Sequence, residues 1–137
     1  MRTMTRLLLL GAVLTCAAGC GGGKSTSDDG ASPPILVAPA SDGGPAAQVA
    51  GEVVVVGGCL ALRSATGDFV VVWPAGTVRG SVPTSVVVPG VGELGVGDRV
   101  DGGGGYYASS SLLADYPRLA ECELGPDDEV AILNPLS

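Results

Sequence analysis

Short valine-rich runs, separated by glycine and proline, fill this 137-residue chain from Gly51 onward. Each run has the length of a strand and is too short for most helices. Glycine and proline interrupt regular structure, and the chain contains 23 glycines and 10 prolines. Valine favours strands because its branched side chain fits a pleated, half-buried surface. The pattern therefore constrains the chain to a small, mainly β fold.

The spacing of these runs predicts five or six short strands. Gly57-Gly58 permits a bend or bulge after the first run, and Pro74 ends the third. A turn at Gly97-Asp98, or alternatively at Val96-Gly97, predicts a hairpin. The predicted strands are a long first strand of 52–56 and 59–63 with a bend between them, then 69–73, 86–88, the hairpin of 93–96 with 98–102, and 129–133.

One helix is predicted, over residues 110–116, because serine caps a helix start and Pro117 prevents its continuation. It precedes the last strand. This order, with a long bent first strand, is typical of OB-type barrels. A closed barrel also removes exposed edges from valine-rich strands. We therefore expect a small, OB-like, partly closed barrel of five to six strands with one short helix. A small sandwich is the alternative.

The first nineteen residues have the layout of a secretory signal. Arg2 and Arg6 precede the apolar run 7–14, and small residues follow that run. The run is too short for a membrane span, which takes about 20 residues. We therefore expect residues 1–19 to be a cleaved signal peptide.

The residues Ala17-Ala18-Gly19-Cys20 resemble the lipobox of bacterial lipoproteins. In that family, the cysteine receives a diacylglyceryl group and becomes the new N-terminus. Ala17 departs from the leucine that the family usually has there. The resemblance implies that Cys20 is lipidated and holds the protein on the extracytoplasmic face of the cell membrane. An ordinary secretory signal, cut near Ala18 or Gly19, is the alternative. The Gly-, Ala- and Val-rich composition is also similar to that of small lipoproteins of high-GC bacteria.

Residues 20–50 are rich in glycine, serine, aspartate and proline, which predicts a flexible tether before a domain at 51–137. The apolar island Ile35-Leu36-Val37 either docks on the domain or has no role. The glycines before Lys24-Ser25 suggest a phosphate-binding loop. However, that motif requires glycine where Ala18 stands and a strand before it. We therefore interpret them as a linker.

The charge balance excludes several classes of function. Fourteen acidic residues against seven basic ones give a net charge of −7, whereas nucleic-acid binding needs a basic face. The chain has no histidine, which removes the commonest general base and metal ligand. A Ser-His-Asp or Cys-His arrangement is therefore impossible within it. We expect no cofactor and no metal.

Two cysteines remain for the folded domain, because Cys16 lies in the signal and Cys20 carries the lipid. Cys59 and Cys122 form an even pair in an oxidising compartment, which predicts a disulfide. A redox or metal-binding pair is the alternative, but neither cysteine belongs to a Cys-x-x-Cys motif.

Three aromatic residues are candidate ligand contacts: Trp73, Tyr106 and Tyr107. A tryptophan at a strand end can stack on a sugar or a proline, and burial in the core is the alternative. The tyrosines follow the run 102–105 of four glycines. Glycines suit a backbone that passes close to a ligand or another backbone, and a flexible loop is the alternative.

Two acidic clusters, Asp98 with Asp101 and the run 127–129, offer oxygens to Ca²⁺. Neither has the ligand spacing of a known calcium loop, so we expect solvated turns. Together these patterns predict a lipid-anchored, non-enzymatic binding or accessory module for a peptide, a glycan or an envelope protein. The alternatives are a small envelope-acting enzyme that uses carboxylates or a metal, and a structural subunit.

Overall fold

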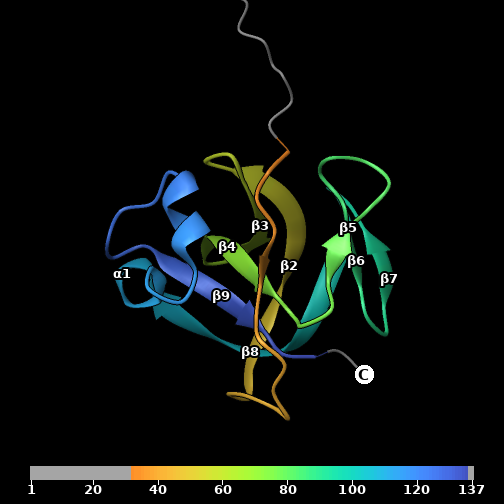
Figure 1. Cartoon of the computed structure of the whole chain (residues 1–137), viewed down its shortest axis with the longest axis horizontal. Coiled ribbons are helices and arrows are strands. Elements are labelled where there is room, and N and C mark those ends of the chain that lie inside the picture. The colour runs from red at the N-terminus through yellow and green to blue at the C-terminus, as the bar shows by residue number, and fades with distance from the viewer. Residues whose placement is uncertain (1–31, 136–137) are drawn as a thin grey trace, which may run out of the picture.

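A computed structural model describes residues 32–135, and its largest element is a sheet that closes into a five-stranded barrel (Figure 1). Neighbouring strands pair in the order β2-β3-β4-β9-β8, and β8 pairs again with β2. Only β4 and β9 are parallel within this ring. The mainly β, OB-like barrel is thus confirmed. The barrel strands are β2 (Ala47–Val56), β3 (Cys59–Ser64), β4 (Gly67–Trp73), β8 (Arg99–Ala108) and β9 (Glu129–Leu133).

The long strand β2 belongs to both halves of the barrel. Its first half pairs with β8 and its second half with β3, so that Glu52 has a cross-strand partner on each side. Gly51 stands where β2 passes from one partner to the other. A Cβ atom there would lie 2.7 Å from the carbonyl oxygen of Arg63. A side chain at this position would therefore separate the strands.

The four glycines at 102–105 are part of β8 and pair with β2 and β9. A Cβ on Gly104 would overlap the carbonyl oxygen of Ile132 and approach Val49 Cγ2 to 2.8 Å. The glycines therefore allow one backbone to pass close to another. The alternative, a flexible glycine loop, is wrong.

A small antiparallel sheet closes one side of the barrel (Figure 1). It consists of β5 (Val78–Arg79), β6 (Val86–Val88) and β7 (Gly92–Leu94). Its buried side chains join those of the barrel interior in one core. The predicted hairpin of 93–96 with 98–102 is wrong, because β7 pairs with β6 and β8 pairs with β2 and β9. The Asp98 carboxylate accepts a hydrogen bond from the Gly95 N–H (2.8 Å), and this turn redirects the chain into the barrel.

Two short helices lie between β8 and β9, on the opposite side of the barrel from the small sheet (Figure 1). They are α1 (Ser109–Leu112) and the 3₁₀ helix η1 (Pro117–Glu121). The predicted helix is therefore correct in place but shorter than 110–116. The chain resumes as η1 with Pro117 at its start, where a missing N–H costs little.

A disulfide joins Cys59 to Cys122, with the two Cα atoms 5.5 Å apart. The pairing of these two cysteines is as predicted. The bond connects the start of β3 to the residue after η1, because Gly57-Gly58 form a turn between two antiparallel strands and not a bend within one long strand. Close by, the Glu123 N–H donates a hydrogen bond to the carbonyl of Gly57 (3.1 Å). The helical segment is thus fastened to the β2–β3 turn at two adjacent points.

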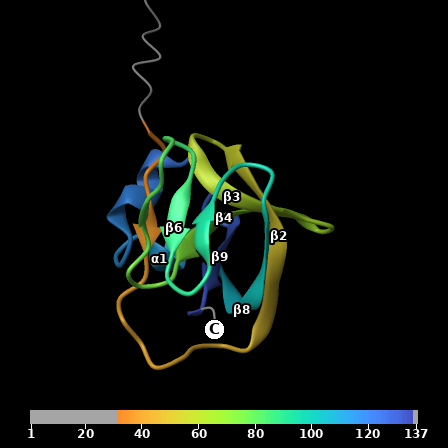
Figure 2. The ribbon, with the colours of Figure 1, turned by 90° about the vertical axis from the view of Figure 1, so that its right-hand side faces the viewer.

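The apolar island at 35–37 docks on the barrel as β1 (Leu36–Val37), which runs parallel to β4. Leu36 is buried, and the Ala38 N–H bonds to the Trp73 carbonyl at 2.8 Å. A connecting segment then passes below the barrel to β2 (Figure 2). The folded part of the chain therefore begins well before Gly51, where the sequence predicted the domain to start. The predicted signal peptide, the lipidation at Cys20 and residues 20–31 of the tether lie outside the described residues.

Candidate functional site

The surface that usually binds ligands in OB barrels is covered in this chain. That surface lies over the second and third barrel strands, which are β3 and β4 here. The two short helices and β1 lie over it and form a second core outside the barrel. The buried side chains of this outer core include Cys59, Ala61, Val70 and Val72 on the strands, and Leu36, Leu112 and Leu119 above them.

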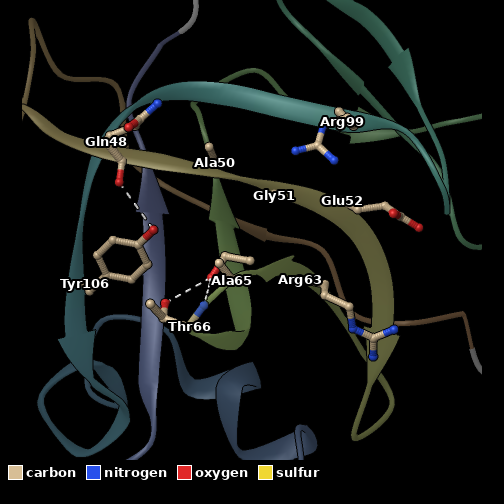
Figure 3. A pocket seen from close by; sticks show the side chains of 10 residues that line it. Gln48, Ala50, Gly51, Glu52, Arg63, Ala65, Thr66, Arg99 and Tyr106 are labelled. Atoms are coloured by element: carbon tan, nitrogen blue, oxygen red, sulfur yellow. Dashed lines mark hydrogen bonds between the residues drawn. The ribbon is translucent and has the colours of Figure 1, made fainter.

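An open groove lies elsewhere, between the first half of β2 and the turn that joins β3 to β4 (Figure 3). It exists because the chain turns back at 64–67 into β4. Residues 47–51 of β2 therefore have β8 on one side and no strand on the other. Its volume is about 510 Å³. The lining residues are Gln48, Ala50, Gly51, Glu52, Arg63, Ser64, Ala65, Thr66, Arg99 and Tyr106.

A row of alternating charges crosses four strands beside this groove. Asp68 on β4 stands opposite Arg63 on β3, Arg63 opposite Glu52 on β2, and Glu52 opposite Arg99 on β8. Arg63 donates two hydrogen bonds of 2.9 Å to the Asp68 carboxylate. These bonds lower the pKa of Asp68 and raise the pKa of Arg63. Opposite charges directly across neighbouring strands stabilise their register.

The other end of this row is unpaired. Within residues 32–135, the structure shows no side-chain hydrogen bond or ion pair for Arg99 or Glu52, although they face each other across β2 and β8. The remaining arginines of that range are engaged: Arg63 by Asp68, Arg79 by the Pro33 and Pro83 carbonyls, and Arg118 by Glu121. Arg99 is therefore a cation available to a ligand at the groove.

Tyr106 is the one predicted ligand contact that lines the groove (Figure 3). Its ring packs edge-on against Phe69, with ring centres 4.9 Å apart. Its hydroxyl donates a hydrogen bond to the Gln48 carbonyl (3.3 Å). The ring is half-buried and fixed in place.

The other two predicted contacts lie away from the groove. Trp73 is 0% exposed in the interior core, so its ring offers no face to a ligand. Its indole N–H also has no hydrogen-bond partner among residues 32–135. Tyr107 packs against the outer core, to which the two short helices contribute. The structure thus separates the three aromatic residues that the sequence grouped together.

Two residues of the acidic clusters close turns: Asp98 accepts the Gly95 N–H and Asp128 accepts the Gly125 N–H (2.7 Å). Asp101 instead accepts the side-chain amide of Gln48 across β2 and β8 (3.1 Å). Among residues 32–135, no group of three or more acidic or sulfur side chains is arranged to hold a metal ion.

A further cluster, absent from the sequence analysis, surrounds Glu93. One oxygen, Oε1, accepts hydrogen bonds from the Ser81 N–H, the Ser81 hydroxyl and the Ser85 hydroxyl, each at 2.6 Å. These bonds lower the pKa of Glu93. A carboxylate with a lowered pKa is a weak general base, so the cluster fastens the β5–β6 loop to β7 and does not activate a serine.

The sequence analysis did not single out Glu52, Arg63 or Arg99. Each is a charged residue in or at the end of a predicted strand, which suggests an outward-facing strand position. Their alignment in one row depends on the pairing of β2 with strands from two distant parts of the chain. No local spacing carries that information.

A scan against protein-family models finds no matching family, and searches of curated proteins and of solved structures find no match. In the part of the chain that the structure describes, no helix has the length and apolar character needed to cross a membrane.

Proposed function

We propose that this protein is a lipid-anchored module outside the cytoplasmic membrane, which binds a component of the cell envelope through the groove. The observation that carries the proposal is the open polar groove with its unpaired Arg99 and Glu52. Charged side chains without protein partners can form charge-assisted hydrogen bonds with a ligand. The rest of the barrel supports them rigidly.

Binding fits this groove better than catalysis. The whole chain lacks histidine, and the pair Cys59 and Cys122 is consumed in the disulfide. Glu52 is the only carboxylate among the lining residues. General acid–base catalysis usually needs a group whose pKa lies near the working pH. The shifted carboxyl pKa values of residues 32–135, at Asp68, Glu93 and Glu121, are all lowered.

A lipid anchor on Cys20 is consistent with the docked position of β1. Two acyl chains give lasting membrane attachment. From Cys20 to Pro33 the chain has thirteen residue steps, which span at most about 45 Å. The barrel would therefore stay close to the membrane, and its acidic surface would be repelled from anionic headgroups.

The anchor is tested by expressing the full chain in a high-GC bacterium and measuring its location and intact mass. We expect the mature protein in the membrane fraction, with the mass of a diacylglyceryl group on Cys20. Cys20→Ala should move the protein out of that fraction, whereas Cys16→Ala should not. An unlipidated mature wild-type protein would refute the anchor.

The groove is tested by co-sedimentation of the protein with an isolated cell envelope. Ala65→Trp should fill the groove and abolish retention, because Ala65 is exposed on the groove turn. Ala40→Trp, at an exposed position before β2, is the matched control and should bind as the wild type does. Equal retention of both variants would contradict the proposal. Chemical alteration of the envelope by the wild type would indicate an enzyme instead.

A further inference from the structure

We propose that the groove recognises an acidic saccharide, in which a sugar ring carries a carboxylate. This inference rests on the proposed binding function and adds the chemical class of the ligand. Three features of the groove carry it: an unengaged guanidinium, a set of hydroxyl partners, and an aromatic ring beside small side chains.

Arg99 supplies the partner for the carboxylate. The neighbouring carboxylates on its own strand and turn are occupied, since Asp98 accepts the Gly95 N–H and Asp101 accepts the Gln48 amide. In Figure 3 the Arg99 side chain leaves β8 and ends beside β2, near Gly51. A planar guanidinium binds a carboxylate through two parallel hydrogen bonds. Glu52, directly opposite on β2, is the one carboxylate in the groove lining, and it forms no side-chain hydrogen bond with Arg99. Arg99 can therefore bind an anionic group even though the whole chain is acidic.

Glu52 and the β3–β4 turn supply partners for hydroxyl groups. The Glu52 carboxylate is an acceptor with no hydrogen bond among the described residues. Across the groove, the Ser64 hydroxyl is engaged within the turn, since it donates to the Gly67 carbonyl and accepts the Thr66 N–H (both 3.2 Å). The Thr66 hydroxyl, 3.1 Å from it, is the one that the turn offers to a ligand. Each hydroxyl both donates and accepts hydrogen bonds. A carboxylate ligand with several hydroxyls matches this set better than a carboxylate alone.

The walls of the groove suit a ring. Tyr106 is held by Phe69 and by the Gln48 carbonyl, while Ala50 and Ala65 leave space beside it. The volume of about 510 Å³ falls within the range of small-ligand sites. Residues 47–51 of β2 pair with β8 alone, so a strand edge is open at the groove. A peptide added to such an edge also needs pockets for alternate side chains. The groove lining is mainly polar, which favours hydroxyl groups over apolar side chains.

The proposal is tested by titrating the ¹⁵N-labelled full chain with trigalacturonate and following the amide resonances. We expect saturable shifts confined to the groove residues, such as Gly51, Thr66 and Tyr106. The fully methyl-esterified trisaccharide keeps the rings and removes the charges. It should bind at least tenfold more weakly, because a charge-assisted hydrogen bond is about twice as strong as a neutral one.

Two arginine variants form the matched pair. Arg99→Gln should weaken binding of trigalacturonate at least tenfold, whereas Arg118→Gln removes the same charge from η1 and should have no effect. Both side chains lie at the surface, and unchanged amide spectra elsewhere will show that the fold is kept.

Three results would overturn the proposal. They are an absence of groove shifts at millimolar trigalacturonate, equal affinity for the acid and its ester, and equal or tighter binding of the peptide acetyl-Gly-Asp-Gly-amide. If the envelope still retains the protein and Ala65→Trp abolishes that retention, only the ligand class is wrong. If the envelope does not retain the wild type either, the binding function itself fails.

Discussion

At the residue scale, glycine determines how closely the barrel strands approach. Gly51 and Gly104 both lie where a side chain would meet the backbone of a neighbouring strand. Their neighbours in the same strands are not restricted in this way. The glycine content of β8 is therefore a packing requirement at particular positions and not a sign of a flexible loop.

Gly104→Ala should destabilise the protein by about 1–3 kcal/mol, the usual cost of an overpacked core. The added methyl group would overlap the Ile132 carbonyl and press on Val49. Gly103→Ala is the matched control, since the nearest atom to its Cβ would be Asn134 Nδ2 at 3.5 Å. Urea unfolding of the two variants measures the difference. Equal midpoints would show that the strands do not approach as closely as described.

At the element scale, short segments stay in place through a few polar contacts. Arg79 donates 2.6 Å hydrogen bonds to the Pro33 carbonyl ahead of β1 and to the Pro83 carbonyl in the β5–β6 loop. Glu93 on β7 binds the same loop through its two serines. Strands of two or three residues bury little surface, so such contacts decide their position.

The loop that Glu93 holds should loosen in acid. Its hydrogen bonds lower the pKa of Glu93 below the ordinary value of 4.5. A carboxyl group with a lowered pKa stabilises the folded state at pH values above its ordinary pKa. This contribution disappears as the pH falls through the folded-state pKa. Hydrogen exchange of the Ser81 amide should therefore be slow at pH 6 and lose its protection below the folded-state pKa.

A pair of glutamate variants checks this assignment. Glu93→Ala should remove the Ser81 protection at every pH. Glu129→Ala removes an exposed glutamate from β9 and should leave it unchanged. Protection of Ser81 that persists in Glu93→Ala would exclude the carboxylate as the holding group.

Docking of β1 should depend on Leu36. This side chain is 4% exposed in the outer core, and Leu→Ala at a buried site costs about 2–5 kcal/mol. We expect a value near the lower limit, since the segment can detach while the barrel stays folded. Val37→Ala, the neighbouring and less buried position, should cost less. Chemical denaturation compares the two, and a larger effect of Val37→Ala would contradict the described facing of β1.

At the scale of the whole molecule, one barrel wall separates two cores. The interior core is closed by the small sheet, and the outer core by the helices and β1. The outer core occupies the surface where OB barrels usually bind ligands, which leaves the groove beside β2 as the open site. The disulfide holds the helical segment against the barrel.

Removal of the disulfide should cost about 2–5 kcal/mol, the usual range for a small secreted domain. The bridge spans 63 positions, so its loss frees a long loop in the unfolded chain. The double variant Cys59→Ala, Cys122→Ala should unfold at lower urea than the oxidised wild type. Reductant should destabilise the wild type and leave the variant unaffected. If reductant leaves the wild type unaffected as well, the bridge does not support the fold.

Local sequence patterns predicted much of the barrel. The apolar runs at 52–56, 59–63, 69–73 and 129–133 all lie in observed strands, because a short apolar run between glycine, proline and turn residues is too short for most helices. The Cys59–Cys122 pair followed from elimination. The predicted hairpin of 93–96 with 98–102 was wrong, because strands that are adjacent in the sequence can each pair with a more distant strand.

The groove could not be predicted in the same way. Trp73, Tyr106 and Tyr107 were grouped by residue type, yet side chains alternate along a strand. Trp73 is buried in the interior core, Tyr106 packs against the same core at the groove, and Tyr107 packs against the outer core. Arg63 and Arg99 reach the groove from strands 36 positions apart in the chain, through their shared neighbour Glu52.

The sequence by itself determined the class of fold, the places of the central strands and the covalent bridge, because these depend on residue type and short-range spacing. It also supports the expectation of an anchored, acidic protein. Only the tertiary structure decided that β1 and the helices cover one face, that the glycines are packed within a strand, and that Arg99 and Glu52 stand unpaired at an open groove. These features depend on which distant strands pair. In a closed barrel each strand must pair on both sides, so one pairing depends on all the others.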